Sequence, residues 1–209
     1  MSAKIDFKIK LKHLYQPSTT SVSIVDVPGM QFLMVDGQGD PNTCLEFKET
    51  YSILYPVAYK LKFMSKAKGK DYVVSPPEAL WWADDMNDFI KGNKNKWKWT
   101  SMIMVPDFIT KEMVEEAIEF TKNKKPELLS AMSKLHFRVL KEGTAAQIMH
   151  IGPYSEETEN IAKIHAFIKD QGGRFDGHEQ KHHEIYLSDP RRTSPNKMKT
   201  VVRQPFVYV

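Results

Sequence analysis

Short segments in which apolar and polar residues alternate, each ended by glycine or proline, predict that much of this chain forms β-strands. Residues 181–190, KHHEIYLSDP, are one example: Ile185 and Leu187 alternate with Glu184 and Tyr186, and Ser-Asp-Pro is typical of a turn. The open question in this segment is Glu184. It is ordinary surface if its face of the strand meets water, and a buried carboxylate beside an aromatic ring if that face is covered.

The order of the predicted elements repeats along the chain. A strand ending in glycine, a helix and a short segment ending in Ser and Pro follow one another in each half: 30–41, 44–64 and 72–77, then 145–157, 157–173 and 185–190. The offset from Gly39 to Gly152 equals that from Ser75 to Ser188, at 113 residues in both. Each copy is expected to form strand, strand, helix, strand and strand, with its first two strands paired as a hairpin.

This repeat predicts an α+β protein made of duplicated strand-helix-strand-strand (SHS2-type) modules. Each antiparallel sheet would carry its helix on one face and meet its twin through the other, and a pseudo-twofold axis would relate the two around a ligand cleft. The expected division is an N-terminal extension (1–20), a first module (21–106), a helical connector (107–134) and a second module (135–209), all in one compact domain.

Composition and charge narrow the class of protein. The 209 residues are 41% hydrophobic and 27% charged, which is typical of a globular protein with a real core. The net charge of +4 is too small to indicate nucleic-acid binding. Cys44 is the single cysteine, so no internal disulfide can form, and no apolar run has the length of a signal peptide core or a membrane span. We expect a cytoplasmic protein with no nucleic-acid or membrane partner.

Aromatic residues are concentrated in the first predicted helix. They recur at every fourth position: Phe47, Tyr51, Tyr55, Tyr59 and Phe63. Because four residues exceed one helical turn, this column winds around the helix, and some of its rings leave the face that packs on the sheet. The rings either pack in the core or line a pocket for an aromatic ligand. Pro56 is expected to kink or break the helix just after Tyr55.

The tryptophans lie in two segments. They are Trp81 and Trp82 after a double proline, and Trp97 and Trp99 alternating with Lys96 and Lys98. Alternating lysine and tryptophan can indicate stacking on single-stranded nucleic acid, but a strand with tryptophans inward and lysines outward is the simpler interpretation. Trp81 and Trp82 are expected in a loop, where at least one of them would cover a pocket.

The segment 178–184 contains three histidines and Glu184, which raises the possibility of a metal site. His182 and His183 would face opposite sides of a strand, and the spacing matches no known ligand motif. We expect no metal and no cofactor, since phosphate-binding and dinucleotide-binding motifs are also absent from the sequence.

Several motifs together resemble the GyrI-like (DNA gyrase inhibitor-like) small-molecule-binding family, in particular a stand-alone bacterial branch. They are VPGMQFLMVDGQGDPN (27–42), LYPVAYKLKFM (54–64), DYVVSPPEALWW (71–82), HIGPYSE (150–156) and HEIYLSDP (183–190). The resemblance implies a drug-binding cleft between two modules, with a buried glutamate that corresponds to Glu184. The segment before Ser21 is too short for a helix-turn-helix domain, so we expect a free-standing member.

That branch is similar to cyclopropanoid cyclopropyl hydrolases, which open the strained ring of DNA-alkylating natural products. The resemblance implies catalytic roles for Glu184 and for a helix tyrosine, which corresponds to Tyr55, with Tyr51 and Tyr59 as neighbouring alternatives. A desolvated Glu184 would suit a general base. The residues expected to hold a flat hydrophobic or aromatic substrate are Trp82, Trp99, Tyr154, Tyr51 and Tyr186.

Two other functions remain open at this point. The same site could sequester lipophilic drugs without turnover, or sense them, because a carboxylate among aromatic rings also recognises cations. Inhibition of a protein partner such as gyrase rests on the family name alone.

Overall fold

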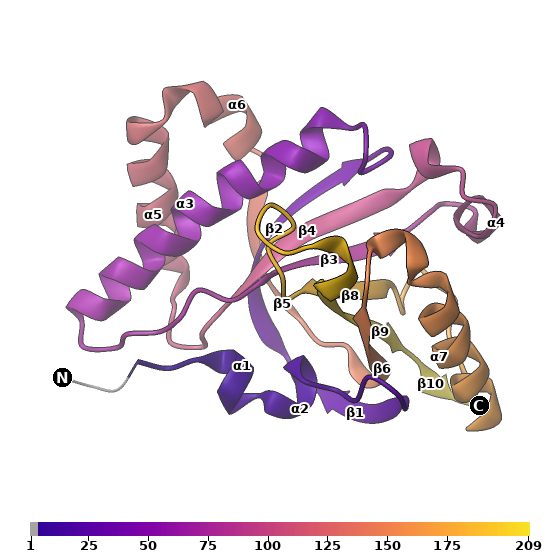
Figure 1. The fold of residues 1–209 in the computed structure, drawn as a ribbon. Coiled ribbons are helices and arrows are strands. Elements are labelled where there is room, and N and C mark those ends of the chain that lie inside the picture. Colours follow the sequence, from indigo (N-terminus) through magenta and orange to yellow (C-terminus); the bar gives the residue numbers. More distant parts are fainter. Residues whose placement is uncertain (1–3) are drawn as a thin grey trace.

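An eight-stranded antiparallel sheet forms the centre of the computed structural model, which describes residues 4–209 apart from the Ile90 side chain (Figure 1). Its strands are β1 (Ser23–Val27), β2 (Met30–Gln38), β3 (Pro77–Trp82), β4 (Lys98–Val105), β5 (Leu135–Leu140), β6 (Gly143–Ile151), β8 (His182–Tyr186) and β9 (Lys199–Pro205). Their order across the sheet is β1-β6-β9-β8-β3-β4-β2-β5. A separate small sheet pairs β7 (Gly173–Arg174) with β10 (Val207–Tyr208).

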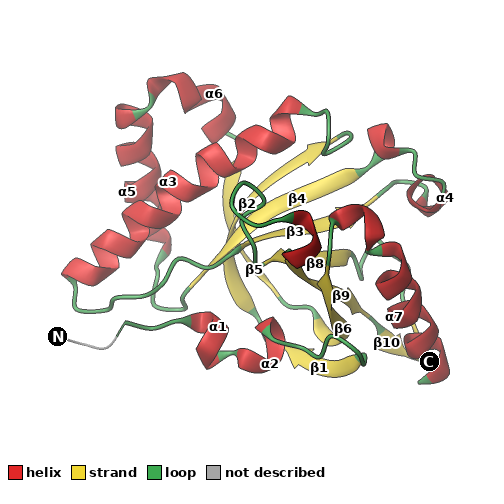
Figure 2. Cartoon of the chain, in the orientation of Figure 1, coloured by secondary structure: helices red, strands yellow, loops and turns green. Residues whose placement is uncertain are grey.

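Helices surround this sheet (Figure 2). The α-helices are α1 (Phe7–Lys10), α2 (Lys12–Tyr15), α3 (Leu45–Ala67), α4 (Met86–Ile90), α5 (Lys111–Lys124), α6 (Leu129–Met132) and α7 (Thr158–Asp170). Single 3-10 turns are η1 (Lys94–Lys96), η2 (Pro126–Leu128), η3 (Tyr154–Glu156) and η4 (Pro195–Lys197). Among the described residues, no helix is both long enough and apolar enough to span a bilayer.

The α+β class is confirmed, but the strands are connected differently from the prediction. Strand β1 pairs with β6 and β5 pairs with β2, so neither expected hairpin forms. The short links explain this difference. A two-residue hairpin needs positive φ in its turn, whereas proline at Pro28 fixes φ near −65° and no described non-glycine residue has positive φ. Each leading strand therefore crosses to the other half of the sheet.

The prediction of two sheets that face each other is also wrong. The halves join edge to edge through the antiparallel pair β3–β8, which makes one continuous sheet. The equal spacing of Ser75 and Ser188 does not mark equivalent positions, because Ser75 precedes β3 whereas Ser188 follows β8. Sequence spacing was misleading here since the segment around Tyr72 forms only a bridge to Ile5 and does not join the sheet.

The two faces of the sheet carry different layers. Helix α3 packs on β2 and β4, and α7 packs on β6 and β9. Val202 of β9 packs against Ile164 and Ile168 of α7, and Trp99 of β4 contacts Phe47 of α3. Strand alternation from these residues shows that both helices cover the same side, which we call the helix face.

The other side of the sheet, which we call the opposite face, is covered in part by the N-terminal segment. Leu14 and Tyr15, at the end of α2, pack there against Met149, Ile185 and Val201. Both faces of β9 are thus covered, which explains its continuous buried run from Thr200 to Pro205 in place of strict alternation.

The aromatic column of α3 winds from the interior to the solvent, as its spacing predicts. Successive rings from Phe47 to Tyr59 lie 6.0–6.3 Å apart, centre to centre. Phe47 packs against Trp81 and Trp99, whereas Phe63 is 58% exposed. The helix continues through Pro56 without a break, so the expected interruption after Tyr55 does not occur.

Gly37 leaves space for the indole ring of Trp99 on the sheet, because glycine has no side chain. The two residues lie directly opposite each other on β2 and β4, and the indole of Trp99 is fully buried over the glycine. A Cβ on Gly37 would lie 2.1 Å from the ring, a distance that no relaxation of the glycine alone can relieve.

We predict that Gly37→Ala destabilises the fold by about 1–3 kcal/mol, because it overpacks a buried contact. Gly29→Ala is the matched control, since its added Cβ would lie 3.3 Å from Val139, a tight contact that a small shift of this exposed side chain relieves. The check is urea unfolding followed by tryptophan fluorescence. Equal urea midpoints for Gly37→Ala and Gly29→Ala would show that the packing of Trp99 does not require glycine at position 37.

Candidate functional site

Glu184 lies on the central strand β8 and points to the helix face. It sits between Ala79 of β3 and Val202 of β9, and its side chain is 15% exposed. The cleft expected between two sheets that meet through their helix-free faces would have placed Glu184 on the side away from the helices. That part was wrong, because Ile185 packs under α2 on the opposite face.

Two donors hold the Glu184 carboxylate. Tyr186 Oη donates to Oε2 at 2.8 Å, and His182 Nε2 donates to Oε1 at 3.3 Å. The indole N–H of Trp81 donates in turn to Tyr186 Oη at 3.2 Å, which fixes the phenol. Burial by itself raises the pKa of Glu184, but the interactions with His182 and Tyr186 outweigh it and lower the pKa below its usual value. Glu184 is therefore ionised at neutral pH.

A second carboxyl group, that of Glu157, lies beside Glu184. Glu157 is 3% exposed and immediately precedes α7. Burial, followed by the charge of Glu184, raises the pKa of Glu157 to about 9. The charge of Glu184 acts on Glu157, whose Oε1 has no hydrogen-bond partner among the described residues, and their environments shift the two pKa values in opposite directions.

Three phenols surround the carboxylates. Tyr186 comes from β8, Tyr51 from α3, and Tyr154 from η3, with the Tyr154 and Tyr186 rings 5.5 Å apart and nearly perpendicular. Burial raises the pKa of Tyr154 to about 12 and raises those of Tyr51 and Tyr186 still further, with the charge of Glu184 contributing to each. Tyr154 is 41% exposed, so the group reaches the surface at this ring. We call Glu184, Glu157, His182, Tyr51, Tyr154 and Tyr186 the Glu184 cluster.

The helix face around the cluster is rich in buried polar atoms without hydrogen-bond partners. They are Tyr51 Oη, Ser101 Oγ, Glu157 Oε1 and Thr200 Oγ1. Thr200 lies opposite Tyr186, and Ser101 lies opposite Ala79, the neighbour of Glu184. Buried polar groups are usually paired, so this concentration is typical of a site that holds a polar molecule.

Comparison with known proteins identifies the family of the chain. The profile of the GyrI-like small molecule binding domain matches residues 20–205. The chain belongs to the GyrI-like family. The stated resemblance is thereby confirmed.

Solved structures from Listeria innocua are similar over nearly the whole chain. An uncharacterized conserved protein is 39% identical with a TM-score of 0.87, and a hydrolase is 40% identical with a TM-score of 0.84. Each match covers 98% of this chain and 100% of the other. The C-terminal domain of EcmrR shares the fold at 14% identity, with a TM-score of 0.56 over 90% of this chain and 98% of that one. No match was found among curated proteins.

Of the two helix tyrosines, Tyr51 is the one that interacts with Glu184. The charge of Glu184 raises the pKa of Tyr51, whereas Tyr55 lies one turn further along α3, where burial and then Tyr59, Asp189 and Arg191 influence its pKa. The role that the resemblance implied for Tyr55 stays a prediction.

The structure does not bring Trp82 or Trp99 to Glu184. Both Trp81 and Trp82 lie on β3, not in a loop, and Trp82 faces the opposite side with Lys181 Nζ 4.1 Å from its ring centre. Trp99 is fully buried beneath Phe47 and Trp81. The tryptophan that supports the site is Trp81, through Tyr186.

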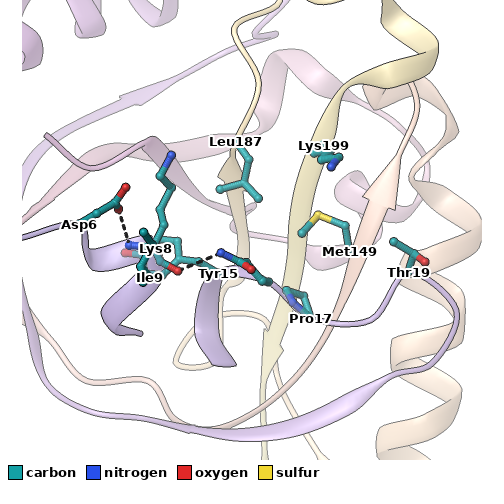
Figure 3. A pocket seen from close by; sticks show the side chains of 10 residues that line it. Asp6, Lys8, Ile9, Tyr15, Pro17, Thr19, Met149, Leu187 and Lys199 are labelled. Carbon is teal, nitrogen blue, oxygen red and sulfur yellow. Dashed lines mark hydrogen bonds between the residues drawn. The ribbon is translucent and has the colours of Figure 1, made fainter. Parts of the chain in front are cut away.

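Two hollows lie on the opposite face. One, of about 430 Å³, separates the N-terminal segment from Met149, Leu187 and Lys199, as Figure 3 shows. The other, of about 300 Å³, lies over Leu80, Trp82, His136 and neighbouring residues. Neither reaches the Glu184 cluster, where the side chains pack closely and only Tyr154 is largely exposed.

Sequence reasoning missed Glu157, His182 as a partner of Glu184, and Trp81. Glu157 stands in a run of charged residues before a helix, where acids are usually exposed. His182 was considered for a metal, but it donates to Glu184 while His183 points to the other face. In the described part of the chain, no three His, Cys, Asp or Glu side chains are placed to hold a metal ion.

Behind the site, on the opposite face, a buried ionic network ties β3 to β8 and β9. His183 bonds to Glu78 through Nε2 and to Glu142 through Nδ1, both at 2.9 Å, and Arg203 Nη1 donates to Glu142 at 2.9 Å. Tyr15 Oη donates to Glu78 at 3.1 Å, which adds α2 to the network. All of these side chains are buried.

The groups of this network stay charged although burial disfavours their charged forms. Desolvation disfavours both charged forms, but His183 and Arg203 lower the pKa of Glu142 to about 2, and the acids raise the pKa of His183 to about 9. The stabilisation from Glu142 is present above its unfolded pKa and is lost as pH falls toward 2. That from His183 is present below its unfolded pKa of about 6.5 and is lost as pH rises through 9.

We predict that Glu142→Gln lowers the free energy of unfolding by about 3–5 kcal/mol near pH 6, because it leaves buried cations without their acid. Glu159→Gln, which removes an exposed pair with Lys163, should leave it nearly unchanged, because solvent screens that pair. Denaturant unfolding at pH 6 makes the comparison. A loss for Glu142→Gln as small as that of the control would contradict the role of the network.

Proposed function

We propose that this GyrI-like protein binds flat hydrophobic drugs or natural products at the Glu184 cluster and hydrolyses cyclopropane-containing DNA-alkylating toxins, which protects the cell. The observation that carries the proposal is an ionised, largely buried carboxylate surrounded by three phenols and by unpartnered polar atoms. The small-molecule-binding description of the family and the hydrolase from Listeria innocua at 40% identity support it.

The reaction requires few protein groups. Water attacks the unhindered cyclopropane carbon, the strained C–C bond breaks, and its electron pair moves to the conjugated carbonyl oxygen as the ring becomes a phenolate. Glu184 takes the proton that the water loses, and the phenolate then takes up a proton to give the phenol. Tyr51 is placed to orient this water, since its hydroxyl has no hydrogen-bond partner in the described residues.

The aromatic rings would bind the substrate. Tyr154 is the ring that a flat molecule meets first, and Tyr186 lies beneath it at 5.5 Å. A polycyclic substrate would have to separate these side chains to reach Glu184, and the area it buries would compensate for the displacement.

We also propose that the site lies where two copies of one structural unit meet. The strand order β2-β4-β3 is mirrored by β6-β9-β8, and the copies join at β3–β8, where Ala79 pairs with Glu184. The swapped strands β1 and β5 occupy matching places at the two edges. The proposed modules, 21–106 and 135–209, would then share one cluster.

Binding without turnover is a second candidate function, and one observation favours it. Both oxygens of Glu184 already accept hydrogen bonds, from His182 and Tyr186, which weakens a base but suits a fixed counter-ion for a cationic drug. A hydrolase consumes excess ligand, whereas a sequestering or sensing protein saturates at one equivalent per site.

We predict that Glu184→Gln keeps substrate binding but lowers turnover about a hundredfold or more, since it removes the base and keeps the shape of the side chain. The measurement is single-turnover loss of a cyclopropane-containing alkylator, followed by absorbance. Glu179→Gln, an exposed acid before the same strand, is the control. Undiminished turnover in Glu184→Gln would show that Glu184 is not the base. Tight binding without turnover in the parent would favour a protein that sequesters its ligand.

A second prediction separates the two helix tyrosines. Tyr51→Phe should lower turnover by about tenfold or more, because it removes the helix hydroxyl on which the charge of Glu184 acts, while Tyr55→Phe should stay within about twofold of the parent. The same single-turnover assay applies. A larger loss of turnover in Tyr55→Phe than in Tyr51→Phe would show that Tyr55 is the helix tyrosine that serves the reaction.

A further inference from the structure

The carboxyl group of Glu157 has no structural task that explains its burial. Glu157 occupies the N-cap position of α7, yet its side chain makes no capping bond to the helix N–H groups. Oε1 has no hydrogen-bond partner within residues 4–209 as the structure describes them, although the residue is only 3% exposed. An acid turned away from the helix and into the protein, beside another acid, needs a different explanation.

The two acids compete for a single set of donors, and Glu184 has them. Tyr186 and His182 donate to its two oxygens, while Oε1 of the buried Glu157 has no donor among the described residues. Two interacting carboxyl groups in a dry environment do not both ionise readily at neutral pH, so one keeps its proton. The distribution of donors places the negative charge on Glu184 and the proton on Glu157, which can then donate to Glu184.

We propose that Glu157 is the proton-holding partner of Glu184, so that the pair carries one negative charge at neutral pH, and that a cationic ligand bound beside Glu184 expels this proton. The inference rests on the proposed function only in placing the ligand at this cluster. Glu157 acts through Glu184 and is a positioning residue in this account.

The other titratable groups around the pair do not replace this role. These groups come from each element that packs around the two acids. They are His182 and Tyr186 of β8, Tyr51 of α3, Tyr154 of η3, His165 of α7, His150 of β6, and Asp189 and Arg191 after β8. The tyrosines stay neutral because their pKa values are raised, and burial lowers the pKa of His165 to about 4, which keeps it neutral as well. Asp189 is the other acid among them, and its hydrogen bond with Arg191 lowers its pKa, so it does not hold the proton.

The pair makes the charge of the site depend on its ligand. A permanent cation near Glu184 favours a second carboxylate, so Glu157 ionises as the cation binds. Affinity for such a cation should increase as pH rises from 7 through 9. A neutral flat ligand gains nothing from the second charge, so its affinity should stay nearly constant over the same interval.

The experiment is calorimetry of an N-methylated acridinium, a flat permanent cation, at pH 7.5 in buffers of different ionisation enthalpy. The parent is expected to release up to about one proton per cation bound, and Glu157→Gln none. Glu156→Gln, which changes the exposed neighbouring acid, should behave as the parent does. Binding without proton release in the parent, or equal release from Glu157→Gln, would overturn the proposal.

A measurement without ligand tests the shared proton by itself. The infrared spectrum of the parent at pH 7.5 should contain a protonated-carboxyl band that disappears above about pH 9 and is missing in Glu157→Gln. A parent spectrum without the band refutes the inference, whatever the ligand results. If the band is present but Glu184→Gln does not change acridinium binding, the two acids do share a proton. The ligand then binds elsewhere, and the proposed release of a proton on cation binding is wrong.

Stability gives an additional check with a definite sign. Because the folded pKa of Glu157 lies above its unfolded value, the folded state binds more protons between pH 4.5 and 9, and its stability decreases across that interval. The decrease should be smaller in Glu157→Gln than in the parent. A steeper decrease in the variant would contradict the assigned protonation.

Discussion

The antiparallel pairing of β3 with β8 is the constraint on which the rest of the structure depends. It joins the two halves of the sheet, and its register decides which side chains reach which face. Glu78 and His183 point to the opposite face, while Ala79 and Glu184 point to the helix face. A shift of one residue in this register would exchange the two sets and place Glu184 under the N-terminal helices.

The buried polar groups on the two faces of this strand pair differ in how completely they are hydrogen bonded. On the opposite face, Glu78, Glu142, His183 and Arg203 hold one another in mutual hydrogen bonds, which fix the register. On the helix face, the donors around Glu184 suffice for one carboxylate, and Glu157 is left with an unpartnered oxygen. A rigid, satisfied network behind an incompletely satisfied cluster is the arrangement expected where local stability is given up for binding.

Local patterns in the sequence predicted the elements well and their connection poorly. The strand around Glu184 and the winding aromatic column follow from spacing within one element, so alternation and helical period were sufficient for them. The edge-to-edge sheet depends on pairings between residues far apart, such as Glu78 with Ile185, which no local pattern contains. The proline at Pro28 did carry the information against a hairpin, because its φ angle is incompatible with the required turn.

The candidate site shows the same division. Glu184 was identified through the family resemblance, but the face it occupies depended on the position of α2, which packs against Ile185. Glu157 was not foreseen because a charged run at a helix start is normally solvated, and only tertiary packing makes this acid buried. Choosing Tyr51 over Tyr55 required knowledge of how α3 is rotated over the sheet.

The location of a bound ligand tests the central claim most directly. A crystal structure of the protein with a flat polycyclic drug should show the ligand on the helix face, against Tyr154 and Tyr186 and within reach of Glu184. The aromatic rings that now pack there would be separated by it. A ligand found instead on the opposite face, in the hollow beside Trp82 or in the one under the N-terminal segment, would contradict the account.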